Sequence, residues 1–194
     1  MTALALIIAG YLVGSIPTGI IVSNLLGAAD PRRQGSGNIG ATNIARLSGK
    51  KAGIITLAGD ALKGALPVLA GLMLAPQTPL LAALAGLAAF IGHLYPLFLG
   101  FKGGKGVATA LGIFLVLAPL AVAVELTLFL LVMVTVRVVS AASLLASLTM
   151  PVCICLLGYP ATSVLVALII SCLITYRHQE NIKRLILGQE PKFF

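Results

Sequence analysis

Residues 4–26 read LALIIAGYLVGSIPTGIIVSNLL, and no charged side chain interrupts this stretch. A helix needs about 20 mostly apolar residues to cross the hydrocarbon core of a bilayer, so the stretch is long enough to span a membrane. The first charged residue of the chain is Asp30. A cleavable signal peptide begins with a basic region, and residues 1–10 contain none. We therefore expect this first segment to be a retained membrane helix.

The whole chain has the composition of an integral membrane protein. Of its 194 residues, 59% are hydrophobic and 9% are charged, whereas a soluble domain carries about 25% charged residues. The mean hydropathy is +1.11. The three cysteines, Cys153, Cys155 and Cys172, lie within apolar runs. We expect them to be buried and to act as small apolar residues, and we infer neither a disulfide nor a metal site from them.

Cutting the apolar runs at charges and at Gly/Pro turns gives seven candidate membrane spans. They are residues 4–26, 53–74, 80–99, 107–117, 121–136, 140–157 and 162–176. The fourth run is short, and only residues 118–120 separate it from the fifth, so six spans are the alternative. We predict an all-α, polytopic integral membrane protein in which residues 1–194 form a single transmembrane domain.

The positions of lysine and arginine favour seven spans over six. Outside the spans, basic residues follow the first, third, fifth and seventh runs: Arg32, Arg33, Arg46, Lys50, Lys51, Lys102, Lys105, Arg137, Arg177, Lys183, Arg184 and Lys192. The other connections contain no lysine or arginine. Seven spans put every basic segment on one side of the membrane, as the positive-inside rule requires, whereas six spans would divide them. We predict the N-terminus outside and the C-terminus in the cytoplasm.

The first basic connection contains the stretch GSGNIGATNIAR at residues 35–46. Its GxGxxG pattern does not indicate a dinucleotide site, because a membrane helix precedes it where a Rossmann motif needs a strand. A plain linker is the alternative. The glycines, however, allow backbone N–H groups to approach an anion, and hydroxyl, amide and guanidinium donors accompany them. The pattern favours a phosphate site built from Ser36, Gly37, Asn38, Gly40, Thr42, Asn43 and Arg46.

Two further basic segments carry groups that suit an anion. Residues 101–109, FKGGKGVAT, are not a Walker A motif, but they place Lys102 and Lys105 among glycines at the expected start of a helix. A plain basic turn is the alternative. In the tail, His178 and Asn181 are neighbours on one face if the last helix continues. The alternative is a helix end that faces lipid headgroups. It explains the basic residues well, but it explains His178 and Asn181 less well. Together, the three segments predict one anion site at the cytoplasmic surface.

Several polar side chains lie inside the predicted spans. Asp60 and Lys63 are three residues apart, and we expect an ion pair, which is either functional or simply self-neutralising. His93 approaches the cytoplasmic end of the third span. It either helps to support the site or is a satisfied structural histidine, and we favour the structural role. Glu125 lies in the fifth span without an obvious partner, and the sequence does not explain it.

The chain resembles the bacterial acyl-phosphate:glycerol-3-phosphate acyltransferase family (PlsY). Residues 35–46, residues 103–109 and the pattern His178-x-x-Asn181-x-x-Arg184 are similar to its three signature motifs. Residues 14–17, Asp60-x-x-Lys63-Gly64 and Gly92-His93-x-Tyr95-Pro96 also look like that family, so the likeness covers nearly the whole chain. One region departs from it. The family usually has Tyr-Val-Ser-Leu after the arginine at position 137, whereas this chain offers Ser140 and Ser143 as candidates.

The resemblance implies a membrane acyltransferase that moves a fatty acyl group from acyl phosphate to the 1-hydroxyl of glycerol 3-phosphate. The products would be lysophosphatidic acid (1-acylglycerol 3-phosphate) and phosphate, in the first step of phospholipid biosynthesis. The reaction would need no acyl-CoA, no cofactor and no metal. It would take place at the cytoplasmic face of the bacterial inner membrane. We expect the two substrates and the lipid bilayer as partners, and no nucleic acid; the oligomeric state stays open, a monomer included.

The same resemblance divides the candidate residues between the two substrates. We expect the phosphate of the acyl donor to bind Ser36, Gly37, Asn38, Gly40, Thr42 and Asn43. Glycerol 3-phosphate would bind Arg46, Lys105, Ser143, His178 and Asn181, and the catalytic candidates are Arg46, Lys105, His178 and Asn181. His178 is either a general base or a phosphate ligand, with the departing phosphate taking the proton. The resemblance leans toward the second role, a substrate-assisted, direct transfer without an acyl-enzyme.

Two other functions compete with this one. A transporter for a phosphorylated solute would place polar groups at the middle of the membrane and would favour an internal repeat, and the chain shows neither pattern. A lysophospholipid acyltransferase with the HxxxxD motif needs an aspartate five residues after its histidine. That position holds Phe98 after His93 and Lys183 after His178, so this alternative fails.

Overall fold

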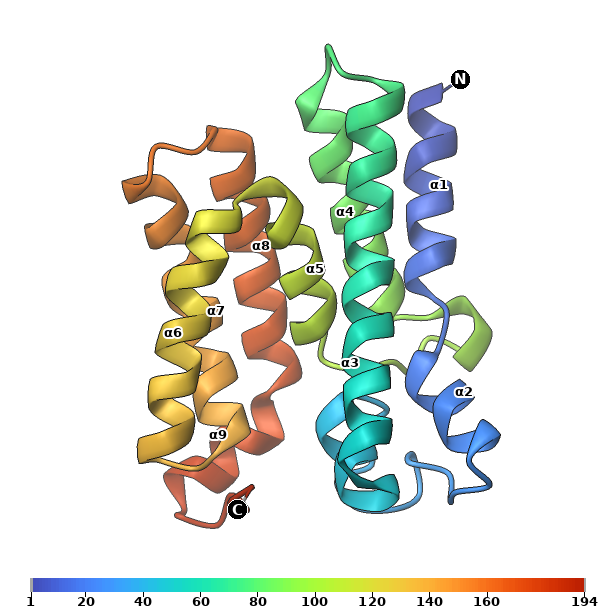
Figure 1. The fold of residues 1–194 in the computed structure, drawn as a ribbon, viewed down its shortest axis with the longest axis vertical. Helices are drawn as coiled ribbons and strands as arrows, with labels where there is room; N and C mark the ends of the chain where they lie inside the picture. Colours follow the sequence, from blue (N-terminus) through green and yellow to red (C-terminus); the bar gives the residue numbers. More distant parts are fainter. Residues whose placement is uncertain (1, 194) are drawn as a thin grey trace. The chain divides into compact units, whose positions relative to one another are not determined.

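The computed structural model describes residues 2–193. Within this range the regular secondary structure consists of helices, without a strand (Figure 1). The α-helices are α1 (Thr2–Gly14), α2 (Thr18–Leu25), α3 (Ala41–Leu74), α4 (Pro79–Leu94), α5 (Val107–Leu117), α6 (Pro119–Thr135), α7 (Val139–Leu156), α8 (Ala161–Arg177) and α9 (Gln179–Ile186). A short 3-10 helix, η1 (Leu97–Leu99), follows α4. The predicted all-α class is confirmed.

Several of these helices are long and apolar enough to cross a membrane. Four segments meet this criterion on their own: Thr2–Leu25, Ala41–Leu74, Pro79–Leu99 and Val139–Leu156. The pair α8 and α9 also meets it when counted as one span with a bend of 63°. The apolar helices α5 and α6 are shorter. Helices thus occupy all seven predicted runs, and the number that crosses the bilayer stays a prediction.

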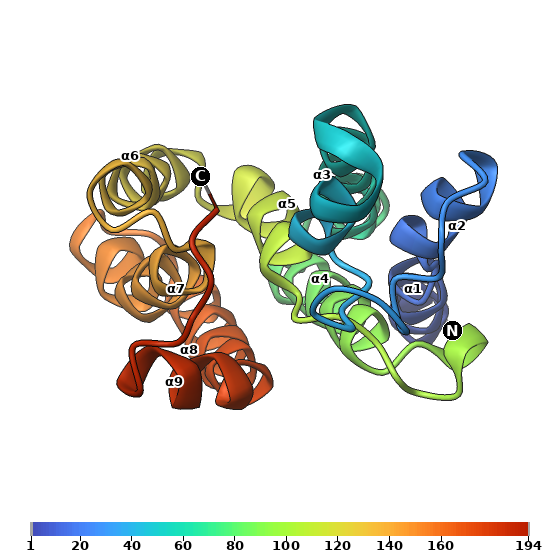
Figure 2. The ribbon, with the colours of Figure 1, turned by 90° about the horizontal axis from the view of Figure 1, so that it is seen from below.

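The chain divides into two compact units, Met1–Val116 and Leu117–Phe194. In the first unit, α4 packs against both α1 and α3, and α2 packs against α3 (Figures 1 and 2). Small residues allow the close approach: a Cβ placed on Gly14 would lie 2.0 Å from the carbonyl oxygen of Ala89. Glycine is therefore required where α1 crosses α4, in keeping with helix packing in membranes.

Helix α5 approaches α3 within the same unit. A Cβ on Gly112 would lie 1.8 Å from the carbonyl oxygen of Ala61, and one on Gly64 would lie 2.2 Å from that of Thr109. Side chains cannot occupy this contact, because main-chain atoms fill it from both helices. The contact fixes the start of α5 on α3. The loop that contains Lys105 lies directly before this start.

In the second unit, α7 packs between α6 and α8 (Figure 2). The carboxylate of Glu125 on α6 accepts a hydrogen bond of 2.7 Å from the hydroxyl of Thr149 on α7. Glu125, which the sequence left without a partner, is therefore a buried link between two helices. The cysteines are free, and the prediction that they are buried is wrong: Cys153 is half-buried, and Cys155 and Cys172 are exposed on apolar helices.

The first predicted span is not one continuous helix. It breaks between α1 and α2, where Pro17 cannot donate a main-chain hydrogen bond. The ammonium group of Lys63, on α3, donates a hydrogen bond of 2.9 Å to the carbonyl oxygen of Ile16. The carbonyl group of Ile16 at the break therefore has its hydrogen bond from a side chain that lies 47 positions further along the chain.

Two other helix boundaries bear on the predicted spans. Helices α5 and α6 do not merge, because α5 ends at Leu117 and α6 begins at Pro119. Helix α3 begins at Ala41, well before the predicted apolar run, and has a non-helical residue at Gly49, with φ of 87°. The second half of the first glycine-rich segment is therefore helical rather than loop.

Candidate active site

Asn43 organises the first glycine-rich segment from within. Its side-chain amide donates hydrogen bonds to the carbonyl oxygens of Pro31 (3.0 Å), Gln34 (3.1 Å) and Asn38 (2.9 Å). Its side-chain oxygen accepts the N–H of Ser36 at 2.9 Å, and Asn43 is 1% exposed. Because the loop uses these donors, Asn43 shapes the segment and does not reach out of it. Binding of a phosphate by Asn43 itself stays a prediction.

The glycines of this segment let the chain turn around Asn43. Gly35 and Gly37 have φ of 63° and 69°, in the left-handed region that favours glycine. A Cβ on Gly35 would lie 2.2 Å from the side-chain oxygen of Asn43. Ser36 and Gly37 are exposed, so the turn that they form faces outward. The segment is thus a tight turn held from inside by one amide.

The remaining predicted residues of this segment lie at the start of α3. The side-chain oxygen of Asn38 accepts the N–H of Gly40 at 3.0 Å, and Gly40 is the residue that caps α3. Thr42 and Arg46 are in the first turns of the helix; Thr42 is half-buried and Arg46 is exposed. A helix N-terminus favours anions, because its first N–H groups have no partner within the helix.

An exposed ion pair lies just before this turn. Arg32 donates to the Asp30 carboxylate from its side chain at 2.7 Å and from its main-chain N–H at 2.9 Å. These hydrogen bonds lower the pKa of Asp30 to about 2. The pair neutralises one of the arginines of the segment.

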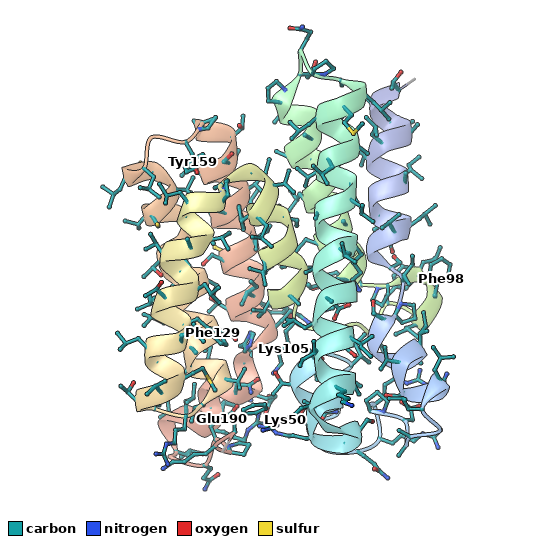
Figure 3. All side chains as sticks on the ribbon, in the orientation of Figure 1. Lys50, Phe98, Lys105, Phe129, Tyr159 and Glu190 are labelled. Carbon is teal, nitrogen blue, oxygen red and sulfur yellow. The ribbon has the colours of Figure 1, made fainter. Side chains whose placement is uncertain are left out.

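The second basic segment is anchored on the end of α4. The N–H of Gly104 donates to the carbonyl oxygen of His93 at 3.1 Å, and the N–H of Gly103 donates to that of Leu94 at 3.1 Å. Lys105 follows, half-buried, and Figure 3 labels it just before α5. Gly106, with φ of 85°, then leads into the helix. The main-chain hydrogen bonds of Gly103 and Gly104 to the end of α4 therefore set the position of Lys105 from its N-terminal side.

A buried charged cluster lies next to this anchor. Lys63 and Asp60 are 2.9 Å apart, which confirms the predicted ion pair. Nδ1 of His93 is 3.7 Å from the Asp60 carboxylate. All three side chains are 5% exposed or less.

The histidine of the tail marks a bend rather than a helix face. Helix α8 ends at Arg177 and α9 begins at Gln179. The last helix therefore does not continue through His178, which was the condition for His178 and Asn181 to share one helix face. Nδ1 of His178 is 2.8 Å from the carbonyl oxygen of Ile174. A carbonyl can only accept, so Nδ1 carries the hydrogen and, in the neutral ring, Nε2 has the lone pair.

Glu190, which sequence reasoning missed, gathers three donors in the second unit. It accepts hydrogen bonds from the hydroxyl of Ser140 (2.7 Å), the side-chain amide of Asn181 and the guanidinium of Arg184 (2.6 Å). Its side chain is 7% exposed. Ser140 is thus engaged by Glu190, and the buried Ser143 stays the candidate for substrate. The sequence carried one signal, a second carboxylate after Glu180 in a basic tail.

Burial and hydrogen bonding act in opposite directions on this carboxylate. Burial alone would raise the pKa of Glu190, but the hydrogen bonds from Ser140, Asn181 and Arg184 together lower it below its ordinary value. Glu190 is therefore ionised at neutral pH.

Among residues 2–193, no cluster of three or more His, Cys, Asp or Glu side chains could hold a metal ion.

The predicted site residues fall into two groups. The first unit contains the group Ser36, Gly37, Asn38, Gly40, Thr42, Asn43, Arg46 and Lys105. The second unit contains the group Ser143, His178 and Asn181. Within the first unit, the turn around Asn43 joins the residues up to Gly40, whereas Lys105 is held separately on α4.

Known proteins match the chain along nearly its whole length. A sequence profile described as Glycerol-3-phosphate acyltransferase matches residues 4–188. A relative of that name from Syntrophotalea carbinolica is 49% identical, over 97% of this chain and 96% of its own. Another from Geobacter metallireducens is 52% identical, over 97% of this chain and 96% of its own.

Solved structures agree with these relatives. One is PlsY (YgiH), an integral membrane glycerol 3-phosphate acyltransferase, in its glycerol 3-phosphate form: TM-score 0.95, 41% identity, covering 100% of this chain and 96% of that one. Its lysophosphatidic acid form gives a TM-score of 0.93 at 40% identity, covering 99% and 95%. The fold and these likenesses define an all-helical integral membrane acyltransferase. The chain belongs to the glycerol-3-phosphate acyltransferase family, as its motifs predicted.

Proposed function

We propose that this protein transfers a fatty acyl group from acyl phosphate to the 1-hydroxyl of glycerol 3-phosphate, releasing lysophosphatidic acid and phosphate. The observation that carries the proposal is the likeness over the whole chain to a solved relative known in glycerol 3-phosphate and lysophosphatidic acid forms. These two forms correspond to the acceptor and the product of the proposed reaction. The identity of the donor rests on the motif resemblance.

The chemistry requires the protein to position substrates more than to activate them. Acyl phosphate is a mixed anhydride, so its carbonyl carbon is already electrophilic and phosphate is a good leaving group. Both substrates are anions, which would repel each other in the absence of cationic groups. Positioning and stabilisation of charge are then the main contributions of the protein.

The donor phosphate is assigned to the turn before α3. Ser36 and Gly37 are exposed there, and the hydroxyl of Ser36 is assigned to the phosphate. The N–H groups of both residues are used within the turn, because they donate to the side-chain oxygen of Asn43 and to the carbonyl oxygen of Gln34. Thr42 and the N-terminus of α3 add a hydroxyl and the positive end of the helix dipole. Asn43 serves this site from inside, by holding the turn in shape.

The acceptor is assigned to Arg46, Lys105, Ser143, His178 and Asn181. Arg46 and Lys105 supply positive charge for the phosphate of glycerol 3-phosphate, and the neutral side chains orient the glycerol. Asn181 donates to Glu190, which fixes the orientation of its amide.

The transfer itself is one displacement at the acyl carbon. The 1-hydroxyl oxygen forms a bond to that carbon, the bond between the carbon and the phosphate oxygen breaks, and phosphate leaves with the electron pair. The hydroxyl proton goes to Nε2 of His178, because the contact of Nδ1 with Ile174 leaves the lone pair of the neutral ring on Nε2. The rival is proton transfer to the departing phosphate.

The cellular arrangement is part of the same proposal. We place the protein in the bacterial inner membrane as a single domain with seven spans, the N-terminus outside and the C-terminus inside. Support comes from the basic residues outside the seven apolar runs, which all fall on alternate connections and in the tail. The active site then faces the cytoplasm, where water-soluble glycerol 3-phosphate is available.

The proposal is tested by phosphate release from purified protein in detergent. We expect release only when acyl phosphate and glycerol 3-phosphate are both present. Release from acyl phosphate alone would indicate hydrolysis. No release at all, together with flux of glycerol 3-phosphate into protein-containing vesicles, would favour the transporter alternative and contradict the enzyme.

A further inference from the structure

A membrane-spanning chain contains few buried charges, because each costs several kcal/mol to desolvate. Asp60 and Lys63 are such charges, and Lys63 has an evident structural task, since it satisfies the carbonyl of Ile16 at the break between α1 and α2. Asp60 is its counterion. The third member of the cluster, His93, has neither of these tasks.

His93 joins the charged cluster to the segment that carries Lys105. Its ring nitrogen Nδ1 lies 3.7 Å from the Asp60 carboxylate, and its main-chain oxygen accepts the N–H of Gly104 at 3.1 Å. Gly104 immediately precedes Lys105. One residue is therefore in contact with the buried acid on one side and with the lysine segment on the other.

The ring of His93 also packs directly against that segment. A Cβ on Gly104 would lie 2.2 Å from Nε2 and 3.0 Å from Cε1 of His93, so only glycine fits beside the ring. The neighbouring Gly103 is restricted differently. Its Cβ would lie 2.1 Å from the main-chain oxygen of His93 and 2.5 Å from Cδ of Pro96.

We propose that Asp60 and His93 are positioning residues for glycerol 3-phosphate. Asp60 orients the His93 ring, and the ring fixes where the Gly103–Gly104 segment lies against the end of α4. The position of that segment in turn sets the position of Lys105. This inference rests on the proposed function, in which Lys105 binds the phosphate of the acceptor. Neither Asp60 nor His93 touches the substrate. Their contribution reaches it only through Lys105.

The first experiment is a double-mutant cycle between His93 and Lys105. His93→Ala should raise KM for glycerol 3-phosphate by about tenfold, because displacements near 1 Å in positioning groups can cost up to about 100-fold. The same change in Lys105→Ala protein should raise that KM less than about twofold, because the positioned group is already missing. KM for acyl phosphate should stay nearly constant throughout. Equal factors in both backgrounds would overturn the proposal.

The second experiment uses the two adjacent glycines as a matched pair. Gly104→Ala should raise KM for glycerol 3-phosphate in the wild-type background and have little further effect in His93→Ala protein, because the obstacle to its Cβ is the ring. Gly103→Ala should be equally harmful in both backgrounds, because its obstacles are the main-chain oxygen of His93 and Pro96. Identical behaviour of the two glycines would contradict a role of the ring.

The variant His93→Asn distinguishes a purely structural role of His93 from a positioning role of its ring. This variant keeps an N–H near Asp60 but removes the ring atoms that face Gly104, so Tm should stay close to that of the wild type while KM for glycerol 3-phosphate still rises. A wild-type KM would overturn the proposal, even if His93→Ala does not fold.

Acceptor binding is also followed as the Tm shift produced by glycerol 3-phosphate alone, which needs no acyl donor. The shift should be smaller in His93→Asn than in the wild type. An inactive wild-type enzyme would count against the proposed function. An active wild type with equal Tm shifts in both proteins would count against the positioning role alone.

Discussion

Asn43 and Glu190 act on the candidate site from behind it. The amide of Asn43 holds three carbonyl oxygens of the first glycine-rich segment, and the carboxylate of Glu190 holds three donors of the second unit. Neither residue needs to touch a substrate to matter, because each fixes groups that are assigned to one. The first predictions concern single side chains of this kind.

His178 is assigned the hydroxyl proton, and its removal should affect turnover more than binding. We expect His178→Ala to lower kcat by at least about 100-fold, the usual contribution of a general base. The measurement is the steady-state rate of phosphate release between pH 5.5 and 8.5. Gln179→Ala, the exposed neighbour at the start of α9, should keep nearly full activity. Retention of a few per cent of activity by His178→Ala, with a flat pH profile, would instead assign the proton to the departing phosphate.

Glu190 should make stability depend on pH. Because the folded-state pKa of its carboxyl lies below the ordinary value of 4.5, the stabilisation is complete above that pH and is lost as pH falls through the lower, folded-state value. The Tm of the wild type should therefore exceed that of Glu190→Gln at pH 7, and the difference should shrink below about pH 4.5. Thermal unfolding in detergent checks this.

The matched control for this prediction is Glu180→Gln. Glu180 pairs with Lys183, but both side chains are about 70% exposed, so the pair contributes little. The Tm of Glu180→Gln should depend on pH in the same way as the Tm of the wild type. A Glu190→Gln variant whose Tm stays parallel to that of the wild type down to pH 3 would show that the carboxylate does not stabilise the fold.

At the scale of helices, the contact between α3 and α5 depends on glycine. Gly112→Ala should destabilise the protein by about 1–3 kcal/mol or more, because its Cβ would meet the main-chain oxygen of Ala61 at 1.8 Å, and main chain cannot rotate away. Gly59→Ala is the matched control. Its Cβ would meet a methyl group of Thr18, which can move.

Thermal unfolding of the two variants provides the comparison. Gly112→Ala should unfold well below the wild type, while Gly59→Ala should stay within a few degrees of it. Equal Tm values for both variants would mean that α5 is not held on α3 by this contact. The start of α5, and the lysine segment before it, would then have another support.

The helices could be predicted from sequence, but the distant contacts at their breaks could not. Long apolar runs indicate membrane helices directly, because backbone groups in lipid must bond within the helix. Pro17 accounts locally for the break after α1, but the hydrogen bond from Lys63 that satisfies the carbonyl of Ile16 comes from a distant residue. The tail geometry likewise depends on Glu190 reaching Ser140, 50 positions away. No local pattern encodes such contacts. The glycine-rich turn was predictable, whereas the inward role of Asn43 required its three partners to be located.

At the scale of the whole molecule, the orientation in the membrane can be measured by cysteine labelling. In a variant with Cys153, Cys155 and Cys172 replaced by serine, single cysteines are introduced by Gln77→Cys and Gln189→Cys. Seven spans with the N-terminus outside place Gln77 outside and Gln189 inside. An impermeant maleimide should therefore label Gln77→Cys in intact cells, and Gln189→Cys only after permeabilisation. Labelling of both from the same side would exclude this topology.

The most direct measurement of the central claim is product analysis from one purified protein with one donor at a time. With isotope-labelled glycerol 3-phosphate and palmitoyl phosphate, we predict 1-acylglycerol 3-phosphate and phosphate in a ratio of about one to one, because each displacement releases one of each. Palmitoyl-CoA should give no product. Formation of lysophosphatidic acid from palmitoyl-CoA but not from palmitoyl phosphate would contradict the account.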